Sequence, residues 1–138
     1  MKIKRVEHIA IAVDSIAESA KMLRDTFGIE VEYEEERPTT RLAMLPIGET
    51  YLELLQGNGP DSAVTRWIDS KGTGLFHICF EVADIDAALA ELKQKGVKLR
   101  DETPRIGHGG SRIAFIDPVC TGNVLIELAE LPAAHQPH

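Results

Sequence analysis

The sequence predicts an α+β fold in which two paired β–α–β–β–β modules form curved mixed sheets with helices on their convex sides. Three observations lead to this prediction. The length of 138 residues, with 43% apolar and 27% charged residues, suits one globular domain. The segment 6–13 alternates around a central histidine, and the segment 75–82 repeats that pattern. A helical pattern that ends at a glycine follows each segment.

The first module reads as a strand, a helix and three further strands. Alternation predicts a strand over 6–13, and apolar residues at helical spacing predict a helix over 16–27 with Asp14 or Ser15 as its N-cap. Gly28 is expected to end this helix, because glycine readily takes the positive φ that closes a helix. The remaining strands are expected at 30–36, 41–46 and 51–55.

The second module repeats this order in a shorter form. A strand over 75–82 precedes a helix over 85–95, which Asp84 caps and Gly96 ends. The remaining segments are a compressed strand at 98–100, a loop at 101–110, and two strands at 112–117 and 125–129. Pairing the two modules by pseudo-twofold symmetry would bury the sheet and helix faces that either module alone exposes.

We therefore predict a single domain over residues 1–138. Its parts are a first module at about 5–57, a connecting amphipathic helix at about 61–70, a second module at about 74–130 and a frayed tail at 132–138.

Charge and composition exclude several partners. The net charge of −7 disfavours nucleic acid, which needs a basic face. No apolar run approaches the roughly 20 residues that cross a bilayer, and the start lacks the apolar core of a signal peptide. We therefore expect a cytoplasmic protein without a membrane partner. Cys79 and Cys120 have no second cysteine nearby, so neither a zinc motif nor a disulfide is expected, and Cys79 is interpreted as a small buried apolar residue.

Each module carries one histidine on its first strand and one glutamate on its last. On the strand 6–13 the apolar residues alternate onto the face suited to the helix, which leaves His8 on the opposite face. By the same alternation Glu53 falls opposite the apolar face of its strand, and Glu127 falls opposite the core face that Val124, Ile126 and Leu128 are expected to form. His77 is assigned to the corresponding face by the repeat.

Two imidazoles and two carboxylates suit a divalent ion such as cobalt, nickel, zinc, manganese or iron, with positions left for water or substrate. The alternative is structural: the histidines are hydrogen-bonded strand residues and the glutamates face solvent. Because all four recur at equivalent places, we predict a metal site formed by His8, Glu53, His77 and Glu127.

Several segments carry a resemblance to a known family: VEHIAIAV at 6–13, LELL at 52–55, PDSAVTRWIDSKGTGLFHICFEV at 60–82, DETPRIGHGGSRIAFIDP at 101–118 and TGNVLIELAE at 121–130. The chain resembles the vicinal oxygen chelate superfamily and, within it, the methylmalonyl-CoA epimerases, over about residues 5–130. The histidine and glutamate positions fit the whole superfamily, including glyoxalase I. The connecting helix and the Gly-x-Gly-Gly loop at 107–110 favour the epimerases.

The resemblance implies an isomerase that interconverts the two configurations at C2 of methylmalonyl-CoA, an acyl-CoA, by proton transfer through a metal-stabilised enolate. It implies that His8, Glu53, His77 and Glu127 hold the ion, with cobalt(II) expected and nickel, manganese or zinc as alternatives. It also implies that Glu127 is one acid/base and that the protein is a homodimer.

The second acid/base is open, because some similar epimerases carry a glutamate at the place that aligns with Arg41. Arginine stays protonated and cannot be a base. We expect Arg41 either to contact the substrate carboxylate or the CoA phosphates, or to be an exposed strand cation. The candidates for the missing group are Glu34, Glu35, Glu36 and Glu49.

The loop of Gly107, His108, Gly109 and Gly110 is predicted to bind the substrate carboxylate, since glycines let backbone N–H groups approach an anion. The alternative is a flexible turn. Two other functions stay open: a lactoylglutathione lyase of the glyoxalase I type, and a metal-free protein that sequesters a ligand. A sequestering cavity has no need of the four ligand positions.

Overall fold

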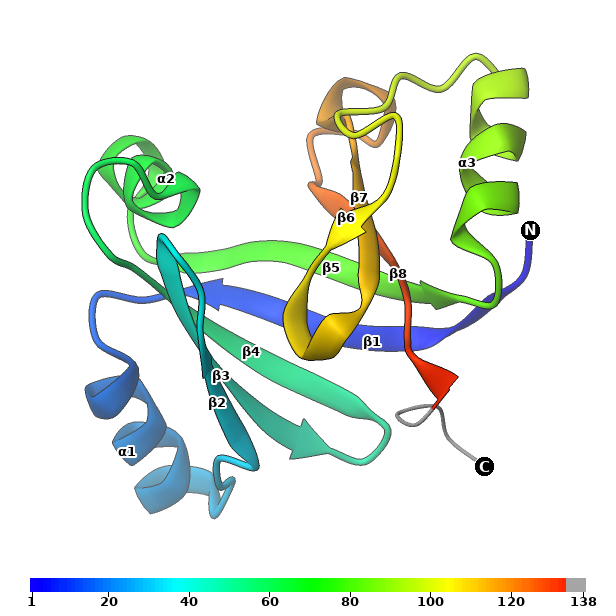
Figure 1. The fold of residues 1–138 in the computed structure, drawn as a ribbon. Helices are drawn as coiled ribbons and strands as arrows, with labels where there is room; N and C mark the ends of the chain where they lie inside the picture. Colours follow the sequence, from blue (N-terminus) through cyan, green and yellow to red (C-terminus); the bar gives the residue numbers. More distant parts are fainter. Residues whose placement is uncertain (134–138) are drawn as a thin grey trace. The chain divides into compact units, whose positions relative to one another are not determined.

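The computed structural model describes residues 1–133, and most of the tail predicted at 132–138 lies outside these residues. The chain forms two compact units. The first unit comprises residues 8–76, and the second comprises residues 1–7 with the chain from His77 onward. Along the chain the elements run β1–α1–β2–β3–β4, then α2, then β5–α3–β6–β7–β8 (Figure 1), so the predicted β–α–β–β–β module occurs twice.

The first unit contains a four-stranded mixed sheet in the order β2-β3-β4-β1. The pair β1/β4 is parallel, and the pairs β2/β3 and β3/β4 are antiparallel. The elements are β1 (Ile3–Ala12), α1 (Ile16–Phe27), β2 (Tyr33–Glu36), β3 (Thr40–Ile47), β4 (Thr50–Gly57) and α2 (Ala63–Lys71). The start of α1 is fixed by Ser15, whose Oγ accepts a hydrogen bond from the Glu18 N–H, and Gly28 closes α1 with a φ of 71°.

The two faces of this sheet pack on different helices. One face packs on α1 through Val13, Ile16, Leu23, Ala43, Leu45 and Leu54. The other face packs on α2 through Ala10, Ala12, Leu42, Met44, Leu55 and Val64. The predicted division of the first strand is therefore confirmed, and His8 lies on the α2 face because it alternates with Ile9 and Ile11.

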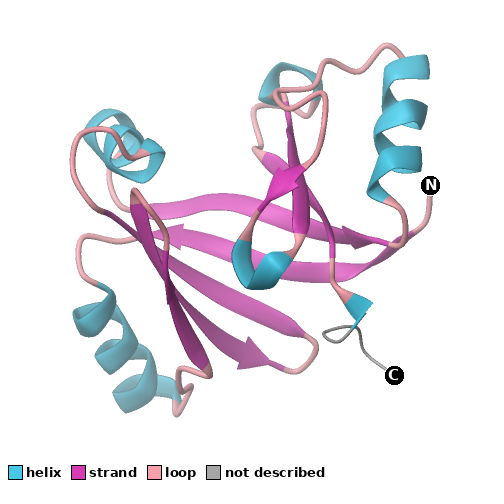
Figure 2. Ribbon diagram, in the orientation of Figure 1, coloured by secondary structure: helices cyan, strands magenta, loops and turns pink. Residues whose placement is uncertain are grey.

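The second unit contains the strand order β5-β8-β7-β6, with β5/β8 parallel and the other pairs antiparallel. Its elements are β5 (Gly74–Val82), α3 (Ile85–Gln94), β6 (Arg105–Ile106), β7 (Arg112–Ile116) and β8 (Ile126–Glu130), with single 3₁₀ turns at His108–Gly110 and Pro118–Cys120. Figure 2 shows how little strand structure lies between α3 and β7. Asp84 caps α3 by accepting a hydrogen bond from the Ala87 N–H.

One face of these strands packs on α3 through Val82, Ile85, Ala88, Leu89, Ala114, Ile116 and Leu128. The opposite face carries a smaller cluster of Cys79, Ile113 and Ala129. His77 alternates with Ile78 and therefore shares the face of Cys79, as the repeat predicted. Both cysteines are free, and Cys79 is fully buried, as expected.

Some boundaries differ from the prediction. The strand expected at 30–36 begins only at Tyr33, and the segment 98–100 contributes one isolated bridge between Leu99 and Ile116. Val124 was expected on the core face of the last strand, but it precedes β8 and is 45% exposed. Within residues 1–133, no helix combines the length and apolar character that crossing a membrane requires.

Candidate active site

The first unit holds a buried histidine–glutamate pair. His8 on β1 and Glu53 on β4 are 0% and 4% exposed, and His8 Nε2 lies 3.3 Å from Glu53 Oε1. The parallel register places Ala10 opposite Glu53, so a small side chain lies beside the carboxylate. Two donor atoms at this separation can bind one ion, because ligands with bonds of about 2.1 Å lie about 3 Å apart.

The second unit holds the corresponding pair. His77 on β5 and Glu127 on β8 are both buried, and His77 Nε2 lies 3.2 Å from Glu127 Oε1. The ring of Phe115 packs edge-on against the imidazole with centroids 5.1 Å apart, and Phe115 is in register with Glu127. The aromatic ring thereby limits the orientations of the imidazole.

Within each unit the structure therefore brings one predicted histidine to one predicted glutamate. Each pair offers a ring nitrogen and a carboxylate oxygen, the donor types that cobalt, nickel, zinc and manganese accept. Burying a carboxylate away from water is costly unless a cation or hydrogen bonds compensate its charge. The donor set of each pair thus fits part of a divalent metal site.

The glycine loop is a closed turn in the second unit. The N–H and the Oγ of Ser111 both donate to the His108 carbonyl, and the Gly107 N–H donates to the Ser111 carbonyl. Gly109 and Gly110 have φ values of 60° and 77°, which side chains disfavour. A Cβ on Gly107 would lie 2.8 Å from the Ile113 side chain. These contacts require glycine and hold the loop in one shape.

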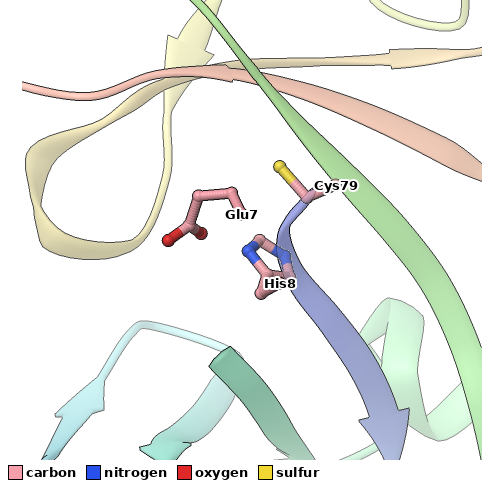
Figure 3. Close-up of side chains that lie close together, drawn as sticks. All are labelled: Glu7, His8 and Cys79. Atoms are coloured by element: carbon pink, nitrogen blue, oxygen red, sulfur yellow. The ribbon is translucent and has the colours of Figure 1, made fainter. Parts of the chain in front are cut away.

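His108 points into the protein and contacts a residue that the sequence analysis missed. Its Nε2 lies 2.9 Å from Glu7 Oε1, and the two side chains are 6% and 3% exposed. The signal in the sequence was Glu7 itself, a polar residue directly before His8 on an otherwise alternating strand. Figure 3 shows Glu7, its neighbour His8 and Cys79; a carboxylate oxygen of Glu7 lies within 4.8 Å of the Cys79 sulfur.

Arg41 lies on the face of the first unit's sheet opposite to His8 and Glu53. It alternates with Leu42 and shares the side of Ala43, which packs on α1. The contact of Arg41 with the substrate carboxylate or the CoA phosphates stays a prediction. Arg41 borders a cavity of about 590 Å³ whose lining includes Ala17, Lys21, Arg24, Glu34 and Gln56.

The structure also separates the candidates for a second acid/base, which are Glu34, Glu35, Glu36 and Glu49. Glu34 lines the same cavity as Arg41, and Glu36 shares its side of β2 by alternation. Glu35 faces the side that carries His8 and Glu53, and its Oε2 lies 3.0 Å from Arg37 Nη1. Glu49 lies in the turn between β3 and β4.

Comparison with known proteins identifies the family to which the chain belongs. A family model described as the glyoxalase/bleomycin resistance protein/dioxygenase superfamily matches residues 7–115. The chain belongs to this superfamily. The mitochondrial methylmalonyl-CoA epimerase of Mus musculus is 32% identical over 132 residues, which are 94% of this chain and 74% of the relative. The ethylmalonyl-CoA/methylmalonyl-CoA epimerase of Cereibacter sphaeroides is 32% identical over 94% of this chain and 99% of the relative.

Solved structures of methylmalonyl-CoA epimerases are also similar to this chain. A Streptomyces coelicolor methylmalonyl-CoA epimerase variant in complex with 2-nitronate-propionyl-CoA is 38% identical, with a TM-score of 0.92 over 99% of this chain and 100% of that one. A methylmalonyl-CoA epimerase in complex with methylmalonyl-CoA and NH4+ gives the same identity, TM-score and coverage. The resemblance to the vicinal oxygen chelate superfamily and its methylmalonyl-CoA epimerases is thereby confirmed, as is the predicted fold class.

Proposed function

We propose that this protein is a metal-dependent methylmalonyl-CoA epimerase, which interconverts the (2R) and (2S) forms by moving a proton at C2. The observation that carries the proposal is the buried histidine–glutamate pair that recurs in both units. The relatives named above support the substrate, because one of the similar structures holds methylmalonyl-CoA itself.

The two pairs are proposed to hold one divalent ion, with His8 and Glu53 supplying two donors and His77 and Glu127 the other two. Their donor types fit cobalt(II), the expected ion, and also nickel, manganese and zinc. When bound, the ion would act as a Lewis acid that offsets the negative charge developing on the thioester oxygen as C2 loses its proton. The single domain predicted over 1–138 is part of the same proposal.

Glu127 is proposed as one of the two groups that carry the proton. A carboxylate can accept the C2 proton on one face of the substrate and return it in the reverse direction. A second group must serve the opposite face, because inversion at C2 requires that the proton leave from one side and arrive from the other. Among the candidates for this second group on β2, Glu35 is the one whose side chain lies on the side of the sheet that carries His8 and Glu53.

The closed loop at Gly107–Gly110 is proposed to bind the substrate carboxylate through backbone N–H groups. Glycine lets the backbone approach an anion without a side chain between them. The His108 side chain is directed to Glu7, so the proposal assigns the ligand contact to the backbone of the loop and not to the imidazole. A homodimer completes the proposal, on the strength of the family resemblance.

Incubation with methylmalonyl-CoA in deuterated water tests this function. The expected result is incorporation of deuterium at C2 with added cobalt(II) and its loss with a chelator. Protein with the four donors replaced should give no exchange. Absence of exchange with added metal, together with isomerisation of a glutathione hemithioacetal, would instead establish the glyoxalase-type reaction. Tight ligand binding with neither reaction would establish a sequestering protein.

A further inference from the structure

We propose that Glu7 is a positioning residue, which fixes the glycine loop in its substrate-binding shape by holding the side chain of His108. The inference rests on the proposed function, since it explains how the loop keeps the form that would bind the substrate carboxylate. Nothing in the predicted metal site requires Glu7, although it directly precedes His8 in the chain.

The loop has a single side chain by which it can be held. Three of the four residues at 107–110 are glycines, so His108 is the only one whose side chain can reach the rest of the second unit. That side chain is buried, and its Nε2 lies 2.9 Å from Glu7 Oε1. The Ser111 hydrogen bonds close the turn on itself, and the Glu7 contact ties the turn to β1.

Glu7 lies beside a partly buried group of charges. Arg5 Nη2 lies 3.8 Å from Glu7 Oε2, and Arg5 Nε lies 2.6 Å from Glu81 Oε1. Lys4 Nζ lies 3.4 Å from the other oxygen of Glu81, which is 0% exposed. Two carboxylates and two cations therefore lie together here, and Arg5 is the cation beside Glu7.

The consequence of this contact is preorganisation. A glycine-rich loop loses more backbone freedom on ordering than other sequences, and that loss weakens binding when it occurs together with ligand capture. Because the folded protein already orders the loop through His108 and Glu7, the ligand need not do so. Replacing Glu7 should therefore lower the affinity for a ligand that carries the carboxylate and leave the affinity for a ligand without it unchanged.

Two acyl-CoA probes that cannot be epimerised, because neither has a stereocentre at C2, test this with matched variants. Malonyl-CoA carries the carboxylate and propionyl-CoA lacks it. Glu7→Leu is expected to weaken malonyl-CoA binding by about tenfold, as loss of one buried charged hydrogen bond would, and to leave propionyl-CoA binding unchanged.

Glu81→Leu is the control, because it removes an equally buried carboxylate on the other side of Arg5. It should lower thermal stability without changing the ratio of the two affinities. Glu7→Gln keeps an oxygen acceptor and should recover most of the lost affinity.

Amide hydrogen exchange of the loop gives a readout that needs no ligand and no activity. Exchange over 107–111 should become about tenfold faster in Glu7→Leu and remain as in the wild type in Glu81→Leu. If Glu7→Leu does not fold, His108→Ala tests the same contact from the loop side. Equal weakening of both probes, or equal effects of the Glu7 and Glu81 variants, would overturn the proposal. If the wild-type protein shows no C2 exchange but Glu7→Leu still speeds amide exchange in the loop, the proposed function is wrong and the role of Glu7 in ordering the loop stands.

Discussion

The two units build the same pair of side chains in different surroundings. In both, the first strand supplies a histidine and the last strand a glutamate, at 3.3 and 3.2 Å. In both, a side chain at the end of the last strand also holds the helix: Gln56 Oε1 accepts a hydrogen bond from the Ile16 N–H. The carboxylate of Glu130 does the same for the Ile85 N–H. The repeated part of the fold is thus the part that places the pair.

The units differ in what lies between their helix and their last two strands. The first unit has the four-residue strand β2 there, whereas the second has the two-residue strand β6 and the glycine loop. Only the second unit's loop places a histidine, His108, against a buried carboxylate, Glu7. On the proposed function, the repeated parts bind the ion and the differing part binds the substrate.

The largest effect on the reaction rate is expected when the histidine of either pair is replaced. On the proposed function, His8→Ala and His77→Ala should each lower the rate of C2 exchange by about a thousandfold or more, because each removes one of the proposed metal donors. Cobalt retained after dialysis, measured beside the rate, checks the cause. A variant of one unit that kept both the metal and the rate would show that the other unit's pair is sufficient.

The next effect separates the two glutamates. Glu127→Gln should lower the rate of epimerisation by about a thousandfold, because an amide cannot carry the C2 proton, whereas Glu53→Gln should lower it by less than about tenfold. Steady-state kinetics on both variants, with metal content measured in parallel, makes the comparison. Equal losses in the two variants would mean that Glu127 acts only as a ligand.

Much of the site could be predicted because it depends on local alternation. The parity of β1 and β8 placed His8 on the face opposite α1 and Glu127 on the face opposite α3, and the repeat placed His77, whose own strand was ambiguous. The helix predicted at 16–27 has the same bounds in the structure, since a serine cap and a closing glycine mark its ends. Local patterns of this kind determine which side of a strand or helix a residue occupies.

The contact between Glu7 and His108 could not be predicted in this way. It joins two segments far apart in the sequence, and burial of both partners depends on how β1 and the loop pack in the folded unit. The same holds for Arg41, whose side of β3 became clear only when Ala43 and Leu45 were seen to pack on α1. Tertiary packing, which leaves no periodic trace in one sequence, decides such placements.

A moderate effect on stability is expected when a glycine of the loop at 107–110, which the first unit lacks, is replaced by alanine. Gly107→Ala should lower the free energy of unfolding by about 1–3 kcal/mol, because the new Cβ would meet the buried Ile113 at 2.8 Å. Gly48→Ala, in the turn between β3 and β4, meets no atom within 4 Å and should cost only the positive-φ strain, about 1 kcal/mol. Urea unfolding of both variants checks the order. A Gly107→Ala protein as stable as the wild type would show that the loop yields easily.

The smallest effect is expected at Arg41. Because Arg41 lies on the α1 side of the first unit's sheet, Arg41→Ala should leave KM for methylmalonyl-CoA within about twofold of the wild type. Initial-rate kinetics over a range of substrate concentrations measures this. A rise of about tenfold in KM would instead support the substrate contact predicted from the sequence.

Stoichiometry tests most directly whether the two pairs act as one site. Metal-free protein is titrated with cobalt(II), and C2 deuterium exchange is measured at each addition. The account predicts a linear rise in rate that stops at one equivalent of cobalt per chain. A rise that continued to two equivalents, or full exchange without any metal, would contradict it.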